Sequence, residues 1–155
     1  MFEAMATRFF FVFLLAGLAF GQTIPVTGIK QPVEILVDKW GVPHVFAKNT
    51  GDAFFAQGFN AARDRLFQID LWRRRGLGRL AEVLGPEALE LDLTARTVGL
   101  PHIAENEWRL LPAEARMLLE AYAAGINAHI AACGDRLPIE FDLLGYRPET
   151  WRPQD

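Results

Sequence analysis

Side chains that could act as nucleophiles are scarce in this sequence. The 155 residues contain no serine and one cysteine, Cys133. Cys133 falls in the apolar stripe of a predicted helix, where a free cysteine usually behaves as a small hydrophobic side chain. With one cysteine the chain has no internal disulfide. A mechanism based on a serine nucleophile must therefore be completed by residues outside this sequence.

Histidines and carboxylates do not form a recognisable catalytic or metal site either. His102 and Glu105 lie one helical turn apart, but zinc needs three or four ligands in fixed geometry, and no second His/Cys pair supports this one. His44 is interpreted as a hydrogen-bonded structural histidine, because a general base needs a substrate proton within reach. Acids at the start of a predicted helix are assigned only a favourable interaction with the helix dipole: Glu87, Glu90 and Asp92.

Six arginines lie between Arg63 and Arg79, in the stretch "FNAARDRLFQIDLWRRRGLGRLAEVLG". A phosphate site requires a glycine-rich loop that leads into a helix N-terminus. Here the glycines follow a helix C-terminus, where cations suit the dipole. We interpret Arg73–Arg75 as a solvated helix end, in which Asp70 pairs with Arg73 or Arg74 for ~0.2–0.5 kcal/mol. The net charge of −3 argues against nucleic acid as a partner.

The N-terminus has the pattern of an export signal. Arg8 precedes twelve apolar residues, 9–20, whereas a membrane-spanning helix needs ~20. Residues 1–21 are therefore predicted to be a signal peptide that is cleaved before Gln22. An uncleaved membrane anchor is the alternative, and Met5 rather than Met1 is a possible start because it removes Glu3 from the leader. We expect residues 22–155 to be periplasmic or secreted, without stable membrane association after signal removal.

The remaining elements follow from periodicity. Alternating apolar residues predict a β-hairpin with strands at 33–38 and 43–47 and a turn at Gly41. Apolar residues then recur at helical spacing until Gly76 and Gly78 end a long helix, which Asn49, Thr50 or Asp52 would cap. Further helical regions are predicted at about 89–109 and 112–132. The tail is predicted to be an ordered loop, packed by three aromatic residues: Phe141, Tyr146 and Trp151. The fold class is α+β, mainly helical with an N-terminal hairpin.

Five stretches, taken in order, resemble the N-terminal part of the penicillin acylases (penicillin amidases), a family of N-terminal-nucleophile hydrolases. They lie at residues 33–59, 61–85, 92–100, 118–130 and 138–155. The family patterns are "D-x-x-G-V-P-H-I-x-A", "A-x-D-R-L-x-Q-M" with "G-x-L-A-E-x-x-G", "D-x-x-x-R", "L-x-A-Y-A-x-G-V-N-A" and "P-x-E-F-x-x-L-G-x-x-P-x-x-W-x-P-x-D". Each is weak alone, but five in the correct order are specific.

The resemblance implies an exported precursor that cuts itself into a small α chain and a large β chain. The β chain would begin with the serine nucleophile, whose own α-amine serves as the base, and would complete a four-layer αββα fold. In the family the acyl-pocket residues and the calcium ligands lie beyond the "W-x-P-x-D" motif or on the β chain. The chain would thus be a truncated α segment with no catalytic, substrate-binding or metal residues of its own. One structural calcium in the full-length enzyme would have its ligands elsewhere.

Ordering roles carry over by resemblance to five residues of the matched motifs: Gly41, Pro43, His44, Asp64 and Arg65. The implied substrate is an amide between an acyl group and a small amine, such as a β-lactam nucleus or a homoserine lactone. The alternative is an exported α-rich binding or interaction module without catalysis. For the segment alone we expect no turnover, and poor solubility because the Phe55, Phe59 and Leu66 helix face would lack its β-chain partner.

Overall fold

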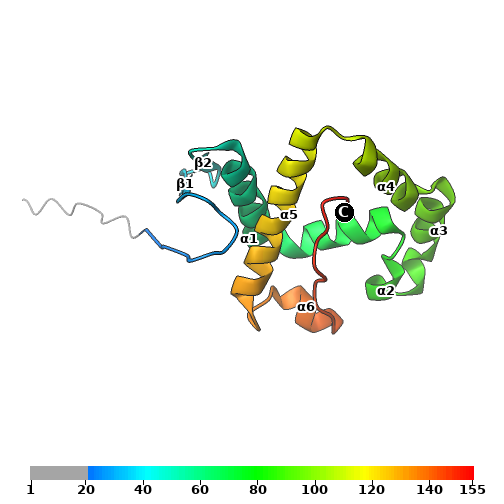
Figure 1. Ribbon diagram of the computed structural model, residues 1–155. Coiled ribbons are helices and arrows are strands. Elements are labelled where there is room, and N and C mark those ends of the chain that lie inside the picture. The colour runs from blue at the N-terminus through cyan, green and yellow to red at the C-terminus, as the bar shows by residue number, and fades with distance from the viewer. Residues whose placement is uncertain (1–20) are drawn as a thin grey trace, which may run out of the picture.

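The computed structural model describes residues 21–155 (Figure 1). This part of the chain is mainly helical with one two-stranded antiparallel hairpin, as predicted. Its elements are β1 (Glu34–Val37), β2 (Pro43–Phe46), α1 (Thr50–Leu77), α2 (Ala81–Leu84), the 3-10 helix η1 (Pro86–Ala88), α3 (Leu89–Val98), α4 (Leu100–Leu110), α5 (Ala113–Cys133) and α6 (Ile139–Leu144). The predicted leader lies outside the described residues, apart from Gly21. Among the helices of residues 21–155, none has the length and apolar character needed to cross a membrane.

The hairpin is held by its turn and by the register of its strands. Ile35 pairs with Val45, and Leu36 pairs with His44. The Asp38 carboxylate accepts hydrogen bonds from the backbone N–H groups of Val42 (2.9 Å) and Trp40 (2.8 Å). These N–H donors, Val42 first, lower the pKa of Asp38. The predicted strands are confirmed to within one residue at each end.

The start of α1 is fixed by two side chains. Asn49 caps the helix by accepting a hydrogen bond from the backbone N–H of Asp52 at 2.9 Å. The Asp52 carboxylate in turn accepts from the N–H groups of Lys30 (2.9 Å) and Gln31 (3.0 Å). The Lys30 N–H contributes most to lowering the pKa of Asp52. The cap therefore also attaches the segment before the hairpin to the helix.

Helices α1 and α5 approach closely enough for backbone contact. A Cβ on Gly58 would collide with the Tyr122 carbonyl oxygen, and one on Gly125 would collide with the Phe55 carbonyl oxygen. Because both contact points are glycine, α5 covers the apolar face of α1, and Phe55 and its neighbours Phe59 and Leu66 are buried. The expectation that this helix face lacks a partner is therefore wrong. The core cluster of the domain follows on from this contact: Ala62, Leu66, Ile126 and Phe141.

Helix α1 is not straight. Arg65 has φ −148° and ψ 34°, which interrupts the helix at this residue, and Figure 1 shows α1 continuing in a new direction toward α2 and α3. Gly78, with φ 65°, ends it. The single helical region predicted at 89–109 is divided at Gly99 (φ 81°) into α3 and α4.

The tail contains a helix that the sequence pattern did not predict. Residues expected to form an ordered loop include α6, a six-residue helix that ends at Gly145 in the left-handed conformation. Six residues make fewer than two turns, too few for apolar periodicity to be recognised. Packing by the three aromatic residues is confirmed, since Phe141 is in the core and Tyr146 and Trp151 pack against it.

Candidate functional site

A buried ionic cluster lies on the second half of α1. The Asp70 side chain is 0% exposed, and its carboxylate accepts hydrogen bonds from Arg73 Nη2 (2.8 Å), Arg74 Nε (2.9 Å) and the Tyr146 hydroxyl (3.0 Å). Arg73 and Arg74 are only 6% and 4% exposed. The interpretation of these two arginines as a solvated helix end is therefore wrong. Arg75 is exposed, as predicted.

The C-terminal segment excludes water from this cluster. Arg73 Nη1 donates to the carbonyl oxygens of Glu149 (3.2 Å) and Thr150 (3.3 Å). The Arg73 guanidinium also lies over the Trp151 ring, with 4.9 Å to its centroid. Asn127 of α5 holds the backbone of Trp151 in place. Its side-chain amide accepts a hydrogen bond from the Trp151 backbone N–H (2.8 Å) and donates one to the Trp151 backbone carbonyl (2.9 Å). Helix α5 and the tail thus cover the charged face of α1 together.

An outer set of ion pairs surrounds the buried carboxylate. Arg74 reaches Glu82 at 2.9 Å, and Arg79 contacts both Glu82 (2.8 Å) and Glu149 (2.7 Å). Hydrogen bonds from Arg79 are the main cause of the lowered pKa of both glutamates. Burial, followed by the charge of Asp70, raises the pKa of the Tyr146 hydroxyl. All of these groups are therefore fixed in one charge state at neutral pH, which suits a structural cluster and not proton transfer.

Helix α3 locks the turn that follows α1. The Asp92 carboxylate accepts from the backbone N–H groups of Leu80 (2.7 Å) and Ala81 (2.8 Å). One turn further along, Arg96 Nε donates to the Gly78 carbonyl at 2.8 Å. Asp92 was expected only to complement the dipole of its own helix. Its contacts show instead that the "D-x-x-x-R" spacing places two side chains on one face of α3 to hold residues 78–81.

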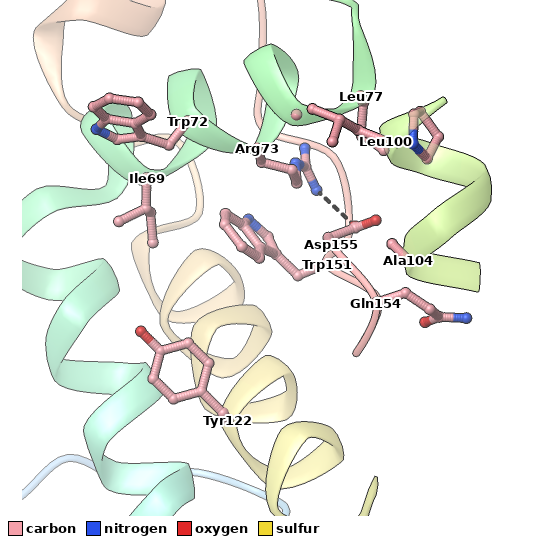
Figure 2. A pocket seen from close by; sticks show the side chains of 12 residues that line it. Ile69, Trp72, Arg73, Leu77, Leu100, Ala104, Tyr122, Trp151, Gln154 and Asp155 are labelled. Carbon is pink, nitrogen blue, oxygen red and sulfur yellow. Dashed lines mark ion pairs between the residues drawn. The ribbon is translucent and has the colours of Figure 1, made fainter. Parts of the chain in front are cut away.

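An apolar pocket of about 410 Å³ lies next to the ionic cluster, between α1, α4 and the C-terminal tail (Figure 2). Its wall contains one ion pair, Arg73 with Asp155 at 3.5 Å, drawn as a dashed line in Figure 2. The lining residues are Ile69, Trp72, Arg73, Gly76, Leu77, Leu100, Pro101, Ala104, Tyr122, Trp151, Gln154 and Asp155. These include no cysteine, histidine or lysine, so this pocket has the character of a packing surface.

Residues predicted from the motifs fall into two separate groups. Gly41, Pro43 and His44 belong to the hairpin, where His44 Nε2 lies 3.3 Å from an Asp38 oxygen. Asp64 and Arg65 lie at the interruption of α1. Both side chains form hydrogen bonds within α1. The Asn60 amide donates to the Asp64 carboxylate at 2.9 Å, and Arg65 donates to the Gln68 side-chain oxygen at 2.9 Å.

The two groups approach each other at one pocket, and both lie apart from the Asp70 cluster. Pro43 and Asn60, the partner of Asp64, both line a pocket of about 320 Å³ between β2 and α1. In the described part of the chain, no hydrogen bond or ion pair joins any of the five motif residues to Asp70. Asp70 was missed as a central residue, although it lies four and eight positions after Leu66 and Ala62, on the same helical stripe.

Cys133 is poorly suited to nucleophilic attack. Its Sγ lies 3.2 Å from His129 Nε2, but burial raises the pKa of the thiol and lowers the pKa of the imidazole. Both shifts oppose the thiolate–imidazolium pair on which a catalytic cysteine depends. Within residues 21–155, no group of three or more His, Cys, Asp or Glu side chains is arranged to hold a metal ion.

Comparison with known proteins gives consistent results. The family model described as penicillin amidase matches residues 32–155. The chain is 46% identical over 131 residues to penicillin acylase 2 proenzyme from Pseudomonas sp. (strain SE83), covering 84% of this chain and 17% of that protein. It is 40% identical over 131 residues to the acyl-homoserine lactone acylase QuiP of Pseudomonas aeruginosa, covering 84% and 16%. The chain therefore spans about a sixth of the length of these curated relatives.

A solved structure also matches the fold. The thermostable penicillin G acylase from Alcaligenes faecalis superimposes with a TM-score of 0.72 at 33% sequence identity. The match covers 80% of this chain and 67% of that chain. The arrangement of the hairpin and the helices in residues 21–155 is thus shared with an acylase structure.

Proposed function

The chain belongs to the penicillin amidase family, and on that premise we propose that it forms the scaffold part of the α chain in a larger amidohydrolase precursor. The observation that carries this proposal is the Asp70 cluster. Residues from the second and fifth motif stretches, Asp70 and Tyr146, bond directly there, and Asn127 of the fourth holds the covering tail. These motifs therefore serve to hold one another and leave the chemistry to other residues.

We propose that the nucleophile is the N-terminal serine of a β chain cut from the same precursor. The chain supports this by having no serine and one cysteine, the half-buried Cys133, whose thiol pKa is raised by burial. In this mechanism the serine hydroxyl attacks the amide carbonyl while its own amine accepts the proton. The amine product leaves with that proton, and water then hydrolyses the acyl ester.

The names of the relatives suggest the substrate class. They are a penicillin acylase and acyl-homoserine lactone acylases, so we propose an amide between an acyl group and a small cyclic amine. The precursor would be exported to the periplasm or secreted, and the β chain would complete a four-layer αββα fold. A calcium ion does not fit the described residues, because the carboxylates of the Asp70 cluster are paired with arginines and no cluster of three acids is free. We propose that any structural calcium of the complete protein has its ligands outside this chain.

The test is to express the precursor from its own gene with export intact. We expect two chains on a denaturing gel, with the larger one beginning at serine, and hydrolysis of an acyl-homoserine lactone or a penicillin. Residues 22–155 produced alone should show no turnover. A single uncut polypeptide with full amidase activity would contradict the proposal. Export of a folded protein without any amidase activity would favour the binding-module alternative.

A further inference from the structure

We draw no further inference here: the strongest candidate, the apolar pocket of about 320 Å³ between β2 and α1 that Asn60 lines, carries nothing, because the Asn60 side-chain oxygen that has no hydrogen bond in the described part of the chain is itself enclosed by protein atoms, and nothing in the structure shows what covers the pocket.

Discussion

Removing the charge of Asp70 is the sharpest test of the buried cluster. Asp70→Asn keeps the shape of the side chain but replaces one acceptor oxygen by an amide that faces a guanidinium. Two buried arginines, Arg73 and Arg74, then lose the anion that compensates them. The substitution therefore probes whether the cluster behaves as buried charge or as hydrated surface charge.

The magnitude follows from burial and from the remaining partners. Removing one member of a buried ion pair costs about 3–5 kcal/mol, because an uncompensated charge is left behind. Arg73 retains Asp155 and two carbonyl oxygens, and Arg74 retains Glu82. These partners reduce the loss, so we expect the lower end of that range, about 3 kcal/mol.

Asp64→Asn is the matched control. Asp64 is also an aspartate of α1 that pairs with an arginine, at 2.9 Å, but its side chain is 41% exposed and that of Arg63 is 37% exposed. An exposed pair of this kind contributes less than about 1 kcal/mol. The two variants therefore share chemistry and helix and differ mainly in burial.

Urea unfolding of residues 22–155, followed by circular dichroism, measures the difference. With a slope of about 1–2 kcal/mol per molar urea, the Asp70→Asn midpoint should fall by about 1.5–3 M, and the Asp64→Asn midpoint by well under 1 M. If both variants shift equally, and by less than about 1 kcal/mol, the cluster is hydrated and the reasoning from burial fails.

Three further predictions use the same unfolding assay. Gly125→Ala places a Cβ against the α1 backbone and should cost about 1–3 kcal/mol or more, whereas Gly76→Ala, where a Cβ meets nothing, should not destabilise in this way. The folded-state pKa of Glu149 and of Glu82 is lowered below 4.5, so their contribution to the free energy of unfolding is complete above that pH and is lost as the pH falls through the lowered values. Glu149→Gln should therefore flatten the acid side of a stability–pH curve. An unchanged curve would refute this. Asp92→Ala removes the acceptor of two backbone N–H groups and should cost about 1 kcal/mol, with faster amide exchange at Leu80 as the specific signature.

Local features of the sequence predicted the elements well. The hairpin follows from alternation and from a turn whose Asp38 and Gly41 act within a few residues. The long helices follow from apolar residues that recur every three or four positions, once in each helical turn. The division at Gly99 was also predictable, because Gly-Leu-Pro places a helix-ending glycine just before a proline that can start the next helix.

The burial of the arginines could not be predicted from local rules. Cations at a helix C-terminus satisfy the dipole whether or not another segment covers them. The segment that covers Arg73 lies 76 and 77 residues further along the chain, and nothing within α1 specifies it. One available signal was the position of Asp70 on the apolar stripe of Leu66, since a carboxylate on a buried stripe requires a buried partner.

The same geometry explains why the family was easier to recognise than the chemistry. Gly58 of the first motif stretch contacts α5 in the fourth, Asp92 and Arg96 of the third hold the turn after α1 in the second, and Tyr146 of the fifth bonds to Asp70. Each stretch contains a residue type that another stretch requires at close range. Such mutual requirements restrict the sequence strongly without involving a substrate, because a glycine at a helix contact and a carboxylate between two guanidiniums have no good substitutes. A family signature in this part of the chain is therefore a signature of packing, and a variant that preserves these contacts should preserve the scaffold whatever acyl group the complete protein accepts.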